Sequence, residues 1–173
     1  MALKKLIFEF VETLVTSFIL VLVLYATVAS MEVVLGSSME PNFFTGERIL
    51  VEKVTKYFGP YQRGDIVVLI PPDEDRHYIK RVVGVPGDII KILDCKVYIS
   101  QNGEKYVLDE TYLGQDTCTT GKSRIKDGRA LRVGEGEYVV LGDNREVFYI
   151  VGVLSICGTL FLLGVKKYLR KTS

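Results

Sequence analysis

The stretch DIIKILDCKVYISQNGEKYVL, residues 88–108, decides the fold of this 173-residue chain. Its short runs of valine, isoleucine, leucine and tyrosine are separated by polar residues and, once, by the pair Asn102-Gly103. Asn-Gly between two strand-like runs is typical of a two-residue β-hairpin turn, because both residues tolerate the positive φ angles that the turn requires. The stretch therefore predicts short antiparallel strands rather than helices.

The same pattern of short β-rich runs and turn residues continues through the middle of the chain, where no long helical periodicity is present. Glycine, proline and aspartate mark the turns. We expect strands over the following ranges: Arg48–Val54, Asp65–Ile70, Tyr78–Val85, Asp88–Leu93, Lys96–Ser100, Glu104–Leu108 and Glu137–Leu141. The predicted fold is mainly β, a partly closed antiparallel β domain over residues 32–146, in which the polar segment Gly114–Arg129 forms a surface excursion.

An uncharged apolar run, Thr13–Met31, precedes this domain. As a helix with a rise of about 1.5 Å per residue it would span roughly 28 Å, which is close to the hydrocarbon thickness of a bilayer. Two lysines among residues 1–12 favour a cytoplasmic N-terminus, and residues 32–146 then lie outside the cytoplasm. A cleaved signal peptide ending near Ala29 is the alternative. The run is long for the apolar region of a signal peptide, so we predict an uncleaved transmembrane anchor at 13–31.

A second uncharged run, Val147–Val165, lies near the C-terminus and is followed by a basic tail, residues 166–173. As a second transmembrane helix this run would return the tail to the cytoplasm, the side that positive charges favour. Three glycines interrupt the run and valine is frequent in it, which is also typical of a pair of buried strands. Both interpretations stay open from the sequence, and we take the crossing as the prediction to test.

Two of the three cysteines, Cys95 and Cys118, lie in the part of the chain that we place outside the cytoplasm, where a disulfide persists. The sequence leaves a Cys95–Cys118 bridge and two unpaired thiols equally open, because it does not supply the geometry. Cys157 falls in the second apolar run, and we interpret it as a small buried residue.

The residues available for chemistry argue against several classes of function. His77 is the only histidine, it lies in a charged run, and no G-x-S-x-G motif is present, so we interpret it as a solvated loop residue and not as the base of a Ser-His-Asp hydrolase. One histidine and scattered cysteines give no spacing typical of metal ligands, so we expect neither a metal nor a cofactor. The 22 Lys and Arg nearly cancel the 21 Asp and Glu, to a formal net charge of +1, so we expect no nucleic-acid partner.

Serine with lysine remains as a route to an activated hydroxyl. Ser38 lies in GSSMEP, residues 36–41, just after the first apolar run, and Lys80 lies in one of the expected strands. A lysine accepts a proton only when it is neutral, although its unperturbed pKa is about 10.4, and apolar surroundings lower that pKa. Strand alternation puts Lys80 on the same face as Tyr78 and Val82, which favours such surroundings.

These two segments, together with two others, resemble the bacterial type I signal peptidase family, whose members are serine peptidases with a Ser/Lys dyad. The nucleophile motif of that family, serine-methionine-any-proline after a transmembrane helix, appears as SMEP at residues 38–41. Its lysine motif appears as YIKRVVGVPGD, residues 78–88, and two further motifs match as GDIVV, residues 64–68, and GDNR, residues 142–145. Four ordered motifs behind an apolar run are far less frequent by chance than any one of them. The resemblance covers roughly residues 1–146.

The resemblance implies a membrane-bound serine endopeptidase that removes signal peptides from exported proteins. In that role Ser38 attacks the scissile carbonyl, Lys80 accepts the proton and returns it to the leaving amine, and the backbone N–H of Ser38 serves the oxyanion hole. Some family members carry a hydroxyl side chain two residues before the nucleophile, where this chain has Gly36. The implied partners are the signal peptides of exported preproteins and the lipid bilayer. The implied location is the cytoplasmic membrane, with the catalytic domain on its extracytoplasmic side.

The resemblance ends after Arg145. The family continues with a Ser-x-Asp-Ser-Arg run that helps to orient the lysine, whereas this chain reads EVFYIVG over residues 146–152. A catalytically impaired membrane-tethered β domain that binds extended peptides without cleaving them is therefore the alternative function. A cytosolic Ser/Lys autoprotease of the repressor type is disfavoured by the first apolar run and by the absence of a DNA-binding segment.

Overall fold

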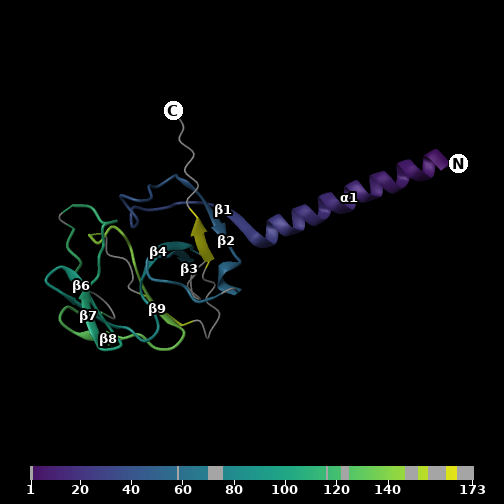
Figure 1. Cartoon of the computed structure of the whole chain (residues 1–173). Helices are drawn as coiled ribbons and strands as arrows, with labels where there is room; N and C mark the ends of the chain where they lie inside the picture. The colour runs from purple at the N-terminus through teal and green to yellow at the C-terminus, as the bar shows by residue number, and fades with distance from the viewer. Residues whose placement is uncertain are drawn as a thin grey trace.

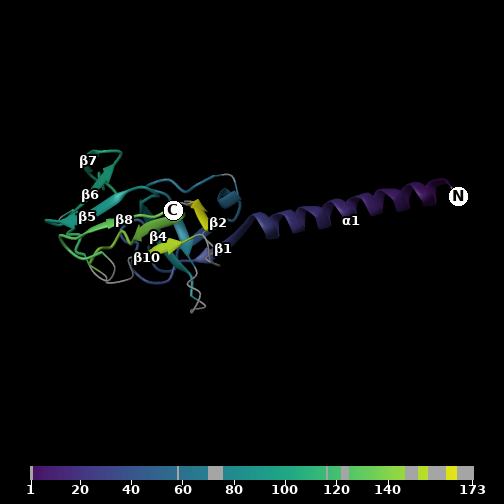
Figure 2. The ribbon, with the colours of Figure 1, turned by 90° about the horizontal axis from the view of Figure 1, so that it is seen from below.

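The structure is a computed structural model that describes residues 2–57, 59–69, 76–115, 117–121, 125–146, 152–155 and 163–166. In this part of the chain a long N-terminal helix, α1, leads into a β-rich body made of a seven-stranded and a four-stranded sheet. Figures 1 and 2 show α1 projecting away from the body, with the smaller sheet at the far end. The fold is mainly antiparallel β with one apolar helix, as the sequence predicts.

Helix α1 spans Ala2–Val28, and its described side chains are exposed along almost its whole length. From Leu3 to Val28 it is long and apolar enough to cross a membrane. Threonine hydroxyls donate to carbonyls one turn earlier, as Thr13 does to Glu9, so these polar groups are satisfied within the helix. The uncharged part of the helix, residues 13–28, therefore suits an apolar solvent without needing partners from elsewhere.

The helix differs in its bounds from the predicted segment 13–31, because it stops at Val28 and Ala29–Val33 forms strand β1. β1 pairs antiparallel with β2 (Arg48–Glu52). The backbone N–H and C=O groups of β1 find their hydrogen-bond partners in β2, so the chain does not need to continue as a helix to satisfy them. The segment that carries Ser38 therefore follows a strand of the sheet and not the helix itself.

The larger sheet has the strand order β1-β2-β11-β3-β4-β9-β10, and its described pairs are antiparallel. Besides β1 and β2 it contains β3 Ile66–Leu69, β4 Tyr78–Gly84, β9 Glu137–Leu141, β10 Gly152–Ser155 and β11 Leu163–Lys166, and the 3-10 turn Thr55–Tyr57 follows β2. β4 lies between β3 and β9, so both of its edges are hydrogen-bonded. A strand held on both edges is a rigid support for the side chains that it carries.

The two described parts of the second apolar run are strands and not a transmembrane helix. β10 pairs with β9, while β11 lies between β2 and β3. At these eight residues the structure has strands, where the sequence analysis took a crossing at 147–165 as its prediction and a pair of strands as its alternative. The rest of that run, with Cys157, and the basic tail after Lys166 lie outside the described residues. The sequence alone left both interpretations open because an uncharged run of this length suits a helix and two internal strands equally well.

The smaller sheet contains β5 Ile89–Leu93, β6 Lys96–Gln101, β7 Glu104–Val107 and β8 Ala130–Arg132, in the order β7-β6-β5-β8. The hairpin predicted at Asn102-Gly103 is confirmed, because both residues have positive φ and Gln101 pairs with Glu104. Each strand predicted from the sequence is present, with ends that differ by at most two residues. β8 is an addition, since its three residues are too few to show a recognisable alternation.

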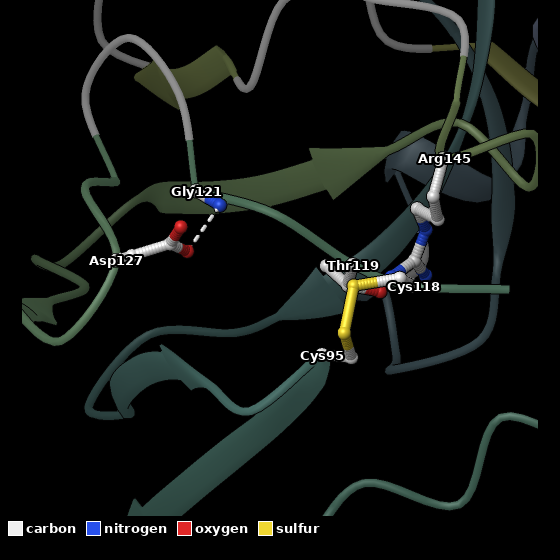
Figure 3. The surroundings of a disulfide bond; sticks show 6 residues. All are labelled: Cys95, Cys118, Thr119, Gly121, Asp127 and Arg145. Carbon is white, nitrogen blue, oxygen red and sulfur yellow. Dashed lines mark hydrogen bonds between the residues drawn. A yellow bond between two sulfur atoms is a disulfide. The ribbon is translucent and has the colours of Figure 1, made fainter.

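A disulfide joins Cys95, in the turn between β5 and β6, to Cys118, in the segment that follows β7 (Figure 3). Of the two states that the sequence left open, the structure therefore has the bridge. It fastens the long polar segment before β8 to the smaller sheet.

The two sheets pack on each other through an apolar cluster and do not close into a barrel. Gly84, at the end of β4, lies where the sheets meet, because a Cβ at this position would overlap the side chain of Ile90. The buried members of the cluster are Val83, Ile90, Ile92, Val97, Ile99, Ile125, Val133, Val139 and Leu141. The predicted β domain is thus two packed antiparallel sheets, and one edge of this core lies beside the candidate site.

A buried ion pair beside this core gives a prediction about stability. The carboxylate of Asp88 is fully buried, lies 2.9 Å from Arg63 Nη1 and accepts the N–H of Val85 at 2.8 Å. Asp88→Ala leaves the Arg63 guanidinium, which is mostly buried, without its partner, so we expect the free energy of unfolding to fall by about 3 kcal/mol. Urea unfolding followed by the near-ultraviolet circular dichroism of the tyrosines measures this. The exposed Asp109 is the control, and an equal loss in Asp109→Ala would contradict the prediction.

Candidate active site

Ser38 lies in the loop between β1 and β2, and apolar neighbours hold this loop against the sheet. Met39 and Phe43 are 0% and 1% exposed, and they pack in a core cluster with Val34. The N–H of Phe43 donates to the carbonyl of Met39 at 3.0 Å, which closes the turn after the serine. Before the serine, Gly36 has a φ of +89°, in the left-handed region that glycine enters readily. The loop is therefore fixed on both sides of Ser38.

Lys80 lies in the middle of β4 and its side chain is buried, with 2% exposed. Its strand partner across the sheet is Val67, which is fully buried, and Val82 on the same face of β4 is buried too. The Nζ atom of Lys80 lies 2.8 Å from Oγ of Ser38, within hydrogen-bond distance. Two side chains that are far apart in the sequence are thus in direct contact.

Burial lowers the pKa of Lys80 from the ordinary lysine value of 10.5 to about 8, because removing water disfavours the charged ammonium. The negative charge of Asp143 acts in the opposite direction and raises the pKa, but the loss of water has the larger effect. A substantial fraction of Lys80 is therefore neutral at mildly alkaline pH. A neutral lysine at this distance can accept the proton of the Ser38 hydroxyl.

The turn after β9, residues 142–145, packs directly against Ser38. The N–H of Asn144 donates to the carbonyl of Ser38 at 3.1 Å. At Gly142 there is no room for a side chain, because a Cβ would overlap the carbonyl oxygen of Ser38 and lie 3.5 Å from Nζ of Lys80. The glycine lets the backbone approach both residues of the candidate pair, so the position of this turn sets the position of the serine.

Asp143, in the same turn, is fully engaged by side chains from two other elements. Its carboxylate forms a bidentate ion pair with Arg81, with Nε–Oδ1 and Nη2–Oδ2 distances of 2.8 and 2.6 Å. It also accepts a hydrogen bond from Nδ2 of Asn42 at 2.9 Å. The guanidinium of Arg81 also lies over the ring of Tyr112, 4.1 Å from its centroid. Because Arg81 follows Lys80 in β4, this ion pair ties the turn to the lysine strand.

Arg145 completes the turn from the other side. Its side chain is 4% exposed, and its Nε donates to the carbonyl of Gly142 at 2.7 Å. Its two terminal nitrogens bind Thr119 and Glu110. Among the described residues, no buried side-chain nitrogen or oxygen lacks a hydrogen-bond partner. The polar groups around Ser38 and Lys80 therefore form a satisfied network, which favours one fixed geometry.

The structure brings together the two residues that the sequence singled out and leaves His77 away from them. His77 is partly exposed, and its Nδ1 lies 3.6 Å from the carboxylate of Glu32. Among the described residues, no group of three or more His, Cys, Asp or Glu side chains could hold a metal ion.

Most of the residues around Ser38 and Lys80 were not predicted from the sequence. Gly142, Asp143 and Arg145 lie in the GDNR motif, but no role for any of them follows from the sequence alone. Glu110 and Thr119 carry no sequence signal, because they meet Arg145 across separations of 35 and 26 residues. A glycine followed by three polar residues after a buried strand was the one local sign that this turn approaches another part of the chain.

Comparison of the sequence with known protein families identifies the family of this chain. The chain matches the family model described as "Signal peptidase, peptidase S26" over residues 7–147. The chain belongs to the signal peptidase family. The match contains Ser38, Lys80 and the turn 142–145, and it ends at residue 147.

Individual proteins with similar sequences are also named signal peptidases. Signal peptidase I of Bacillus licheniformis is 36% identical over 146 residues, which cover 83% of this chain and 76% of that protein. Signal peptidase I S of Bacillus subtilis (strain 168) is 36% identical over 151 residues, covering 82% and 76%, and signal peptidase IB of Staphylococcus aureus (strain COL) is 33% identical over 156 residues, covering 84% and 79%. A solved signal peptidase I from Enterococcus faecalis V583 matches with a TM-score of 0.40 and 28% identity, covering 53% of this chain and 83% of that one.

Proposed function

We propose that this chain is a membrane-bound serine endopeptidase that removes signal peptides from exported proteins with a Ser38/Lys80 dyad. The observation that carries the proposal is the 2.8 Å contact between Lys80 Nζ and Ser38 Oγ, made by a lysine that is 2% exposed. Membership of the signal peptidase family supplies the substrate class. A buried lysine beside a serine fits that chemistry, because burial keeps the amine available as a base.

In the proposed reaction, Ser38 Oγ attacks the scissile carbonyl carbon while neutral Lys80 takes the hydroxyl proton. The tetrahedral intermediate carries an oxyanion, for which the N–H of Ser38 is the proposed donor. When the intermediate collapses, the C–N bond breaks, the ammonium of Lys80 returns the proton to the leaving amine, and an ester of Ser38 remains. Water then attacks this ester with Lys80 again as the base, which releases the new carboxylate and restores the serine.

Helix α1 is the proposed membrane anchor, with the β-rich body on the extracytoplasmic side. Between the end of the helix and Ser38, the side chains of Met31, Val33 and Leu35 are exposed and apolar, so the surface that leads to the serine suits contact with the bilayer. A signal peptide has its own apolar segment in the membrane. Anchoring the enzyme confines both molecules to one plane and raises the concentration of the scissile bond near Ser38.

A membrane-tethered domain that binds extended peptides without cleaving them is the other candidate, and the altered sequence after Arg145 was its motive. The relatives are named signal peptidases, which does not support this alternative. Binding alone also gives no reason for a lysine to be buried beside a serine hydroxyl, because burying an amine costs hydration free energy.

Cleavage of a preprotein by the purified full-length chain in detergent tests the proposal. We expect a new mature N-terminus, located by mass spectrometry, that appears with the wild-type chain and not with Ser38→Ala. A wild-type chain that binds the preprotein and leaves it intact would refute the proposal and favour the non-cleaving domain.

The pKa of Lys80 predicts how cleavage depends on pH. Lys80 acts as a base only when neutral, so kcat/KM should rise with pH through a pKa of about 8 and level off above it. At pH 6, two units below that pKa, roughly 1% of the lysine is neutral, so the rate should be about 100-fold below the plateau. Lys105→Met, at an exposed lysine in β7, is the control and should leave the profile unchanged. A flat profile between pH 6 and 9 would contradict Lys80 as the base.

A further inference from the structure

The side chain of Arg145 extends from the turn that packs on Ser38 toward the segment that carries the Cys95–Cys118 disulfide. Figure 3 shows its guanidinium reaching toward Thr119, the residue that follows Cys118. Nη1 of Arg145 donates to Oγ1 of Thr119 at 2.6 Å, while Nε of the same side chain donates to the carbonyl of Gly142 at 2.7 Å. A single buried side chain therefore connects the segment after the disulfide to the candidate active site.

The charge of Arg145 is balanced inside this cluster. Its Nη2 pairs with Glu110, whose side chain is 10% exposed, and the hydroxyl of Tyr112 donates to the same carboxylate at 2.7 Å. A planar guanidinium with several fixed partners has little freedom to rotate. The three acceptors on Thr119, Glu110 and Gly142 therefore define one orientation for Arg145.

The disulfide fixes the position of Thr119. Thr119 is buried, and its N–H donates to the carbonyl of Cys95 at 3.1 Å. The segment that carries Thr119 is thus tied to the turn between β5 and β6 by one covalent bond and one hydrogen bond next to it. Reduction would remove the covalent tie and leave the hydrogen bond to hold the segment alone.

From the Arg145 side, the path to Ser38 is equally short. Arg145 holds the carbonyl of Gly142, where an added Cβ would overlap the carbonyl oxygen of Ser38, and the N–H of Asn144 donates to that same oxygen at 3.1 Å. A shift of this turn would move the serine relative to Lys80. Even a displacement near 1 Å lowers catalytic rates by up to about 100-fold.

We infer that Arg145 is a positioning residue for the Ser38/Lys80 pair and that the Cys95–Cys118 disulfide, acting through Thr119, holds it in place. The inference rests on the proposed function for its consequence, which is that the rate of cleavage depends on the redox state of this chain. Lys80 comes from the larger sheet and Ser38 from the loop between β1 and β2. The disulfide would add a covalent support that lies outside this larger sheet.

The test compares the oxidised and reduced full-length protein in detergent with Thr119→Val, which keeps the side-chain shape and removes the hydroxyl acceptor. Reduction and Thr119→Val should each lower kcat by about tenfold or more with little change in KM, because neither touches the substrate. Thr119→Ser restores an acceptor and should keep most of the wild-type kcat. Reduction of the disulfide in the Thr119→Val variant should lower kcat little further, since both changes break the same connection. Arg129→Lys, at an exposed arginine, should behave as wild type in both redox states.

A second readout does not depend on turnover. The pKa of Lys80, followed by NMR of lysines labelled with carbon-13 at Cε and assigned with Lys80→Arg, should rise on reduction and in Thr119→Val, because a loosened turn admits water to the amine. If the wild type cleaves and neither kcat nor this pKa responds to reduction or to Thr119→Val, the inference is overturned while the proposed function stands. If the wild type does not cleave at all, the proposed function fails, and the pKa response alone decides whether Arg145 positions Lys80.

Discussion

Ser38→Ala and Lys80→Ala are each expected to lower kcat for signal-peptide cleavage by about 10⁴-fold or more, and the double variant should be no worse than either single one. The reason is that the 2.8 Å pair works as one unit: without the amine the hydroxyl is not activated, and without the hydroxyl the amine has nothing to activate. Single-turnover cleavage of a preprotein, with the product quantified on gels or by mass spectrometry, measures the three rates.

Two further variants separate this mechanism from simple damage to the site. Lys80→Arg keeps a positive charge and should be as inactive as Lys80→Ala, because a guanidinium does not lose its proton in this range of pH. Ser37→Ala removes the neighbouring hydroxyl, whereas Lys80 contacts that of Ser38, so this variant should keep activity within a few-fold of wild type. Near-normal turnover by Lys80→Ala at neutral pH would exclude lysine as the base, whatever the other variants do.

The sequence predicted the features that depend on neighbouring residues. The hairpin at Asn102-Gly103 was predictable because its turn needs positive φ at two consecutive positions, and the chain has the residues that allow it. Alternation along β4 favoured apolar surroundings for Lys80, since Tyr78 and Val82 lie two positions away on the same face. In both cases a pattern a few residues long carries the physical cause.

Features that depend on distant partners were not predictable in this way. Ala29–Val33 reads as the end of an apolar helix and becomes a strand because β2 offers it a pairing edge. β11 lies between β2 and β3, which no property of residues 163–166 alone would indicate. The cluster of Arg145 with Glu110 and Thr119 has the same origin, because each contact joins segments that only the folded sheets bring together.

Gly142→Ala should show how narrowly this site is built. The added Cβ would overlap the carbonyl oxygen of Ser38 and approach Nζ of Lys80 to 3.5 Å, and both neighbours are held, the first by the N–H of Asn144 and the second by β4. The turn or the serine loop must therefore move. We expect kcat to fall by about 10²- to 10³-fold, measured with saturating preprotein, and stability to fall by about 1–3 kcal/mol through overpacking.

The matched control for Gly142→Ala is Gly59→Ala, where the same methyl group would meet no atom within 4 Å and the backbone is not in the positive-φ region. It should leave kcat and stability near those of the wild type. The comparison distinguishes a steric requirement from a general effect of replacing glycine, because the chemical change is identical and only the surroundings differ. If Gly142→Ala kept kcat within twofold of wild type, the turn after β9 would have room to retreat. Its contact with Ser38 would then not be what sets the distance between the serine and the lysine.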